Sequence, residues 1–307
     1  MNDTYIRTLV SPGGTIEASF APRAGMVGCS LRHRGVELLH MGRGLREYTT
    51  HGTTFGIPFL YPWANRLAGF DYFALGKQVQ LEHGSRLIRL EQNGLPIHGV
   101  LGASPHWEVD YAADEGDAAM LSAVLDFGGY PALLRAFPFP HTVRLGVRVT
   151  DTEVEFTTTV AADRGVPVPI SFGFHPYLRL MGAPRQQWEI ELPVRERLVL
   201  DDYMIPTGER QPAGALDGPL GDRAFDDGFA GVEHERPFAV SGGGRRIAVH
   251  FDERFPFAQV FSPPGAEFIC FEPMTAPTNA LRSGQDLPIA QPGDEFRATW
   301  RIVVTQT

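Results

Sequence analysis

Apolar residues alternate with polar or small ones along several stretches, and this period-two pattern is what most constrains the fold. It is clearest over residues 143–149, where valine or leucine fills every second position ahead of an Asp151-Thr152 turn, and it continues over residues 154–160. Successive side chains of a β-strand point to opposite faces, so alternation predicts a hairpin with one buried face. The same pattern recurs at residues 73–81, 107–111, 188–192, 247–251 and 296–304.

Glycine and proline separate these stretches at short intervals. The 307 residues include 34 glycines and 25 prolines, which favours short strands joined by turns over long helices. Residues 117–127 fit either a helix or a strand, and their strand-like neighbours favour a strand. Thr207 to Gly221 is predicted to be a loop. We therefore predict an all-β fold, a large antiparallel β-sandwich that forms a single domain over residues 1–307.

The charge balance argues against polyanionic partners. Lysine and arginine number 27 against 36 aspartates and glutamates, a net charge of −9, and no local basic cluster offsets it. Such a surface repels phosphate backbones and anionic lipid headgroups. We expect no nucleic-acid partner and no membrane partner.

Targeting and cysteine patterns lead to further expectations. The first residues lack the basic and apolar segments of a signal peptide, and no run of about 18 apolar residues follows. We expect a cytoplasmic protein. Cys29 and Cys270 stand far apart without a CxxC motif, so we expect no zinc site, no other metal and no disulfide.

Lys77 is the only lysine, which removes several classes of chemistry. It belongs to a predicted hairpin turn, Leu75 to Gln78, exposed to water, where an amine is poorly suited to Schiff-base or pyridoxal phosphate catalysis. Nucleophile-elbow, zinc-protease, dinucleotide-binding, P-loop and EF-hand motifs are also missing. The sequence thus favours side-chain chemistry without a cofactor.

Five segments place polar residues among apolar ones, at residues 56–67, 95–99, 170–177, 224–229 and 268–279. Glu272 follows four apolar residues in a predicted buried strand, where glutamate is rare unless it is paired. The alternative is a strand end at which Glu272 meets solvent or an arginine. His175 stands beside Phe174 and Tyr177, and is either a catalyst or a hydrogen-bonded core histidine.

The remaining candidates also have ordinary alternatives. His98 precedes a glycine and fits a turn histidine. Asn65 and Arg66 fit a loop-capping amide and a surface ion pair. Asp226 and Asp227 precede Gly228, as turn residues do.

The order of these motifs resembles the aldose 1-epimerase family, whose fold is galactose mutarotase-like. The matching segments are Gly25-Met26-Val27, similar to the family's first core strand; Pro62-Trp63-Ala64-Asn65-Arg66; Ile97-His98-Gly99; Phe174-His175-Pro176-Tyr177; Phe225-Asp226-Asp227-Gly228-Phe229; Phe271-Glu272-Pro273; and Gln291-Pro292-Gly293-Asp294-Glu295. The resemblance spans nearly the whole chain. It implies a β-supersandwich that binds a sugar in a cleft, without metal or organic cofactor.

The resemblance also implies residue roles. In mutarotation a base takes the C1 hydroxyl proton while an acid protonates the ring oxygen, the ring opens, the C1–C2 bond rotates and closure reverses the steps. By resemblance Glu272 is the base, His175 the acid and His98 an assistant near the ring oxygen. Asn65, Arg66 and Asp226 hold sugar hydroxyls. We expect an isomerase with a small-molecule sugar substrate, as a monomer or a homodimer.

Three alternatives remain open. The substrate is either a neutral aldose, which the acidic net charge favours, or an anionic sugar such as a hexose 6-phosphate or a sulfonated hexose. A dianionic group needs a second cation besides Arg66. A non-catalytic carbohydrate-binding protein of the same fold is the third alternative, against which the joint presence of Glu272, His175 and His98 argues. Whether Asp226 or the adjacent Asp227 contacts the sugar also stays open.

Overall fold

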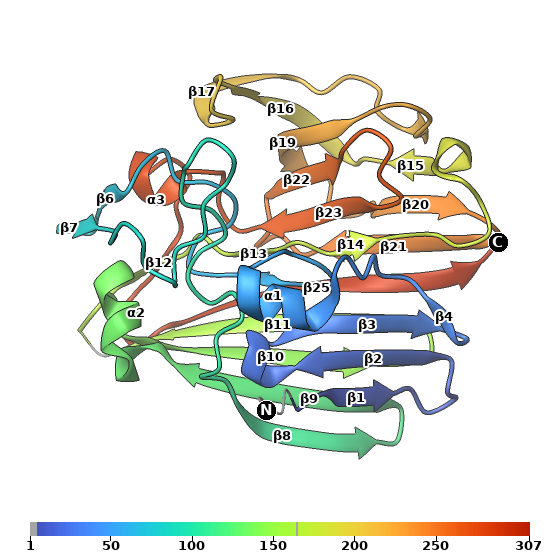
Figure 1. Cartoon of the computed structure of the whole chain (residues 1–307), viewed down its shortest axis with the longest axis horizontal. Coiled ribbons are helices and arrows are strands. Elements are labelled where there is room, and N and C mark those ends of the chain that lie inside the picture. Colours follow the sequence, from blue (N-terminus) through green and yellow to red (C-terminus); the bar gives the residue numbers. More distant parts are fainter. Residues whose placement is uncertain (1–4, 164) are drawn as a thin grey trace.

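The computed structural model describes residues 5–163 and 165–307, and two layers of antiparallel β-sheet dominate it (Figure 1). One layer is a nine-stranded sheet with the order β18 (Gly218–Pro219), β15 (Glu189–Glu191), β20 (Phe238–Gly242), β21 (Arg245–Phe251), β25 (Glu295–Gln306), β11 (Glu153–Ala162), β10 (His141–Val149), β9 (Ala118–Asp126) and β8 (Glu108–Glu115).

The second layer consists of two sheets. The eight-stranded sheet has the order β17 (Pro206–Pro212), β16 (Val194–Leu200), β19 (Phe225–Val232), β22 (Phe257–Ser262), β23 (Ile269–Met274), β13 (Gly173–Phe174) and β5 (Phe59–Leu60), with β14 (Tyr177–Leu178) also paired to β23. The four-stranded sheet contains β1 (Arg7–Val10), β2 (Ile16–Ala21), β3 (Val27–His33) and β4 (Val36–Glu37). In Figure 1 β1, β2 and β3 run across the face of the nine-stranded sheet near β9 and β10.

Short elements complete the described chain. Two small two-stranded sheets pair β6 (Asp71–Ala74) with β7 (Lys77–Gln80), and β12 (Val168–Pro169) with β24 (Ile289–Ala290). The helices are α1 (Gly44–His51), α2 (Pro131–Ala136), α3 (Ala280–Ser283) and the 3₁₀ turns η1 (Pro22–Ala24), η2 (Phe127–Gly129) and η3 (Arg185–Gln187).

A hydrophobic core fills the space between the layers. Three aromatic pairs join them, with ring centroids 5.9, 5.0 and 5.7 Å apart: Phe20–Phe156, Phe174–Trp300 and Phe238–Phe271. Burying one such side chain stabilises the fold by roughly 1.5–3 kcal/mol. The core cluster extends from Leu9 to Val304. It supports the single-domain expectation, which stays a prediction.

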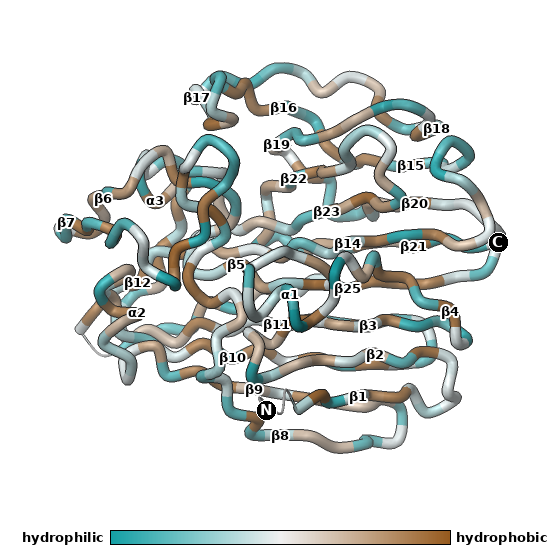
Figure 2. Tube along the Cα trace, viewed as in Figure 1, coloured by the Kyte–Doolittle hydropathy of each residue, from teal (hydrophilic) through white to brown (hydrophobic). Residues whose placement is uncertain are grey.

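The alternating segments form strands as predicted. In the β10–β11 hairpin Val149 faces Val154 across the Asp151-Thr152 turn, and every second residue of β10 is buried. Residues 118–126 form β9, which confirms the strand predicted there. Figure 2 shows hydrophobic and hydrophilic residues alternating along the long strands. The predicted all-β antiparallel sandwich is confirmed.

Two local predictions need correction. Thr207 to Gly221 is not a loop throughout, because β17 and β18 lie in this region. Since β17 is an exposed strand at the end of its sheet, it carries no apolar alternation. The β6–β7 hairpin is present, but Lys77 is half-buried: its Nζ donates to the Pro138 carbonyl at 2.5 Å.

Candidate active site

A pocket of about 190 Å³ opens on the face of the eight-stranded sheet that points away from the core. Its lining consists of Thr54, Asn65, Arg66, Ile97, His98, His175, Tyr177, Asp226, Gln259, Phe261 and Glu272. The structure thus brings together all six residues that the sequence singled out. The volume suits a small molecule.

Glu272 lies in the middle of β23, and its carboxylate faces the pocket. Phe271 points the other way, into the core against Phe238, because neighbouring residues of a strand alternate between faces. Glu272 is 1% exposed, so the alternative of a solvent-exposed strand end is wrong. Burial raises the pKa of its carboxyl well above the usual value, the Asp226 charge raises it further, and the Arg66 charge lowers it.

His175 follows β13 and lies against β23. Its backbone N–H donates to the Pro58 carbonyl at 3.2 Å, and its ring stacks on Tyr177 with centroids 4.3 Å apart. These contacts fix the direction of the imidazole. Burial lowers the pKa of His175 to about 3, because a charged ring would lose its hydration there.

His175 and Glu272 face each other directly. The imidazole Nε2 lies 3.2 Å from Oε1 of the carboxylate. Within residues 5–163 and 165–307, neither His175 Nδ1 nor Glu272 Oε2 has a hydrogen-bond partner, although both atoms are buried. Unpaired buried polar atoms are costly, so their presence beside a pocket is typical of a site that binds a polar ligand.

His98 lies edge-on to His175, with ring centroids 5.5 Å apart. Its backbone is left-handed, with φ of 63°, and its N–H donates to the Asn65 carbonyl at 2.9 Å. Burial is the main cause that lowers the pKa of His98 well below the usual value, followed by the charges of His175, Arg89 and Arg66. His98 is therefore a neutral imidazole at neutral pH.

Gly99 allows this arrangement. Its φ is +70°, and a Cβ there would lie 2.0 Å from the Tyr61 carbonyl oxygen. Glycine is the residue that fits both the conformation and the close approach. Steric constraints thus explain why glycine follows His98 in this motif.

Arg66 contacts three polar side chains in and behind the pocket wall. Its Nη1 donates to Asn65 Oδ1 at 3.0 Å, and its Nη2 lies 3.4 Å from Asp226 Oδ2. Its Nε lies 3.7 Å from Oε2 of Glu91, a nearly buried carboxylate. Glu91 also accepts from the backbone N–H groups of Asn93 and Leu95, so it fixes this loop behind Arg66.

The two adjacent aspartates occupy different environments. Asp226 lines the pocket and accepts a hydrogen bond from Gln259 Nε2 at 2.7 Å. Asp227 is outside the pocket lining, and its Oδ1 lies 3.7 Å from Arg197 Nε. Of the two, Asp226 is placed to meet a ligand.

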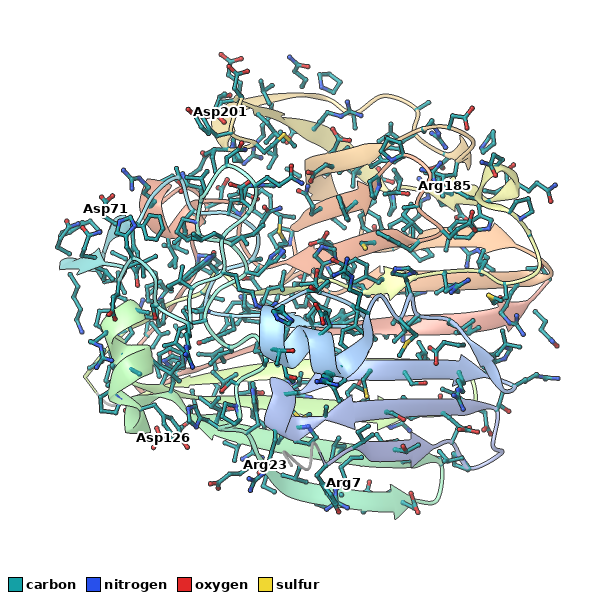
Figure 3. All side chains as sticks on the ribbon, in the orientation of Figure 1. Arg7, Arg23, Asp71, Asp126, Arg185 and Asp201 are labelled. Atoms are coloured by element: carbon teal, nitrogen blue, oxygen red, sulfur yellow. The ribbon has the colours of Figure 1, made fainter. Side chains whose placement is uncertain are left out.

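A buried arginine supports the strand that carries Asp226. Figure 3 shows Arg185 among the strands, whereas the labelled Arg7, Asp126 and Asp201 lie at the periphery. Arg185 donates to the Gly221 and Arg223 carbonyls, both at 2.5 Å, and to Ser262 Oγ at 3.1 Å. It therefore ties the turn before β19 to β22.

Sequence reasoning missed three polar lining residues. Gln259 is 3% exposed and lies opposite Glu272 in the β22–β23 pairing. It stands among apolar residues in Phe257-Ala258-Gln259-Val260, the same signal that identified Glu272. Tyr177 was part of a motif but had no assigned role, and its hydroxyl contacts Thr54 Oγ1 at 2.5 Å. Thr54 has no sequence signal.

Across residues 5–163 and 165–307, no three histidine, cysteine, aspartate or glutamate side chains are arranged to hold a metal ion. Over the same ranges, no helix combines the length and apolar character that crossing a membrane requires.

Comparison with known proteins identifies relatives. The sequence profile of the family described as Aldose 1-epimerase matches residues 26–303. A curated Escherichia coli (strain K12) protein, named Uncharacterized protein YihR, is 25% identical over 293 residues, which cover 86% of this chain and 88% of that protein.

Solved structures share the fold. A galactose mutarotase-like protein from Clostridium acetobutylicum superposes with a TM-score of 0.84 at 17% identity, covering 100% of both chains. Galactose 1-epimerase from Lactobacillus acidophilus NCFM gives a TM-score of 0.78 at 13% identity, covering 100% of this chain and 96% of that one. At these identities the likeness establishes the galactose mutarotase-like fold.

Proposed function

The chain belongs to the aldose 1-epimerase family, and we propose that it interconverts the α and β anomers of a monosaccharide by acid–base ring opening and closure. The family is one of isomerases. The single observation that carries the proposal is the buried pair of His175 Nε2 and Glu272 Oε1, 3.2 Å apart at a small polar pocket.

The proposed reaction moves protons through the sugar. Glu272 takes the proton from the C1 hydroxyl, and His175 gives a proton to the ring oxygen, so the C1–O5 bond breaks and an aldehyde forms. Rotation about C1–C2 and the reverse transfers close the ring as the other anomer. The pair starts and ends with one proton, so no cofactor enters the balance.

The electrostatics of the pocket fit a shared proton. Burial opposes a charge on either member of the pair, which favours the neutral form with the proton on Glu272. The Arg66 charge acts in the other direction and favours the Glu272 carboxylate. A sugar that displaces the direct contact places its hydroxyl and ring oxygen between two groups that exchange a proton readily.

The other lining residues have binding roles in this proposal. Arg66, Asn65 and Asp226 already form a connected set of donors and acceptors, so their remaining hydrogen-bonding capacity is fixed in direction for sugar hydroxyls. His98 stands beside His175 as a neutral imidazole and contacts the ring oxygen side of the sugar.

The test is anomer exchange, measured by polarimetry or by NMR saturation exchange on freshly dissolved α-glucose and α-galactose. We expect exchange above the spontaneous rate for the wild type. Glu272→Gln should lose this exchange. Asp227→Asn should keep it, because Asp227, the neighbour of Asp226 in the sequence, lies outside the pocket lining. Exchange equal to the spontaneous rate for every sugar, with sugar binding intact, would indicate the non-catalytic alternative.

A further inference from the structure

A groove of about 790 Å³ lies next to the sugar pocket, between α1 and the segment at residues 86–103. In Figure 1 α1 stands in front of the sheets beside this segment. The groove is lined by Tyr48, Thr49, Thr50, His51, Gly52, Arg86, Ile88, Arg89, Leu90, Gly102 and Ala103. Within the described part of the chain, this lining contains two arginines and a histidine but no carboxylate.

Two connections join the groove to the pocket. Gly52 lines the groove, and Thr54, two residues later, lines the pocket. The Arg89 carbonyl accepts a hydrogen bond from the N–H of Ile97 at 2.9 Å, and Ile97 lines the pocket. Burial is the main cause that lowers the pKa of His98 and raises that of Tyr177, and the Arg89 charge is close enough to act on both groups, in each case toward a lower pKa.

The Arg89 guanidinium occupies a shaped slot. Its Cζ lies 4.8 Å from the centroid of the Tyr48 ring, a cation–π contact. A Cβ on Gly52 would lie 3.1 Å from Arg89 Nε, and one on Gly102 would lie 2.7 Å from both Cζ and Nη2. The two glycines therefore leave the space that the guanidinium fills.

Neither Arg86 nor Arg89 forms a side-chain hydrogen bond or ion pair with any residue in the described part of the chain. No neighbouring acid among the described residues therefore neutralises either charge, in contrast to Arg148 and Arg236, which contact Asp117 and Asp217. The nearby acids are engaged elsewhere: Glu47 with Arg43 and His51, and Glu91 with Arg66.

Among the residues that the structure describes, the sugar pocket offers no cation comparable to Arg86 and Arg89. Arg66 lies within 3.4 Å of Asp226 and 3.7 Å of Glu91, so two carboxylates already balance its charge. An anion bound directly there would also meet Glu272. The groove beside it is locally positive, although the chain as a whole has a net charge of −9.

We propose that this groove receives an anionic substituent, such as a phosphate or sulfonate, carried by the sugar whose anomeric centre lies at Glu272. The proposal rests on the proposed function and names its substrate class, an anionic aldose. Arg89 supplies the fixed donors and Arg86 a second positive charge, because a guanidinium fork matches the geometry of such oxyanions.

The test compares anomer exchange of glucose with that of glucose 6-phosphate. The expected wild-type result is a higher kcat/KM for the phosphorylated sugar. Arg89→Gln should lower the ratio of the two kcat/KM values about 10- to 100-fold, as for loss of one charge-assisted contact. Arg297→Gln removes an exposed arginine on β25 and should leave the ratio unchanged.

Gly102→Ala tests whether Arg89 acts by direct contact with the anion or only through the long-range effect of its positive charge. The added methyl group displaces the Arg89 guanidinium but keeps its charge. We expect the ratio to fall in this variant also. A wild-type ratio near one, or a ratio that Arg89→Gln leaves unchanged, overturns the proposal.

Calorimetric titration with glucose 6-phosphate and with inorganic phosphate separates the two proposals. If the protein does not accelerate anomer exchange of any sugar, the proposed function fails, and the binding data alone then test the proposal for the groove. Glucose 6-phosphate binding that Arg89→Gln abolishes supports the groove; absence of binding overturns it. Inorganic phosphate that binds as tightly as the sugar phosphate points to a free-anion site and overturns the assignment to a substituent.

Discussion

The imidazole Nε2 of His175 lies 3.2 Å from the carboxylate Oε1 of Glu272, and the two side chains are 7% and 1% exposed. In the sequence each residue precedes a proline, which favours an extended backbone. They reach each other because β13 and β14 both pair with β23. Two side chains nearly a hundred positions apart in the sequence are thus in direct contact.

Replacing Glu272 by glutamine should leave the fold and sugar binding intact but lower kcat by about 10²- to 10⁴-fold, because an amide cannot accept the proton. His175→Asn should cause a comparable loss. In the double variant the two losses should not multiply, since each group acts through the other. Anomer exchange at saturating sugar is the measurement, with the spontaneous rate subtracted. Near-wild-type exchange by Glu272→Gln would make Glu272 a structural residue.

The pH profile of kcat/KM should keep its plateau well below the ordinary histidine pKa. Burial lowers the pKa of His175 to about 3 and raises that of Glu272, so the pair holds one proton between those limits. The acid limb, where a second proton binds, therefore lies well below pH 6.5. Exchange measured from about pH 3 to pH 8 tests this. An acid limb near the usual histidine pKa would mean that an unperturbed imidazole controls the rate.

Arg66→Ala should raise KM more than it lowers kcat. Its guanidinium binds through fixed donors and does not release a proton at neutral pH. Loss of a charge-assisted hydrogen bond costs about 1.5–3 kcal/mol, which corresponds to roughly 10- to 100-fold in KM. Steady-state kinetics of anomer exchange separate the two parameters. A collapse of kcat at constant KM would instead assign Arg66 a role in the transition state.

Glu272→Gln should also change how stability depends on pH. In the unfolded chain Glu272 loses its proton near its ordinary pKa of 4.5, but the folded protein keeps the proton to higher pH. Over that interval wild-type stability falls as pH rises, by about 1.4 kcal/mol per pH unit. Glutamine has no such dependence. The Tm gain of the variant over the wild type should be larger at about pH 8 than at about pH 4; an equal gain would contradict a raised pKa.

Gly99→Ala should unfold the protein more easily and displace His98. The left-handed backbone costs alanine about 1–2 kcal/mol, and the methyl group would collide with the Tyr61 carbonyl, which is backbone and cannot turn aside. Gly94→Ala is the matched control, since Gly94 has φ of +79° and open space around its Cβ position. Thermal unfolding of both variants separates collision from backbone strain, and equal Tm losses would show that the collision is relieved.

Strands with one buried face were predictable because they need an apolar residue at every second position, and this alternation is visible in the sequence. The β10–β11 hairpin shows this, with alternate residues of both strands buried. Exposed β17 has no buried face, so its sequence resembles a loop. Helix α1 was not foreseen, because Tyr48 is its only buried residue and gives no helical period.

The site was predictable where a polar residue interrupts an apolar run. Glu272 and His175 stood out for that reason, and Gln259 would have stood out by the same reasoning. Arg89 and Glu91 lie in a loop, where charged residues are ordinary, so their positions beside the pocket follow from tertiary structure alone. The proposed residue roles and the single domain remain predictions.

The strands β8 and β17 at the ends of the two large sheets bear on self-association. β8 exposes Asp114 and Glu115, whose carboxylates repel an approaching copy of the same strand. β17 begins and ends with a proline, and proline lacks the N–H that a further strand would need. These two edge strands therefore resist the edge-to-edge pairing through which β-proteins aggregate into fibrils.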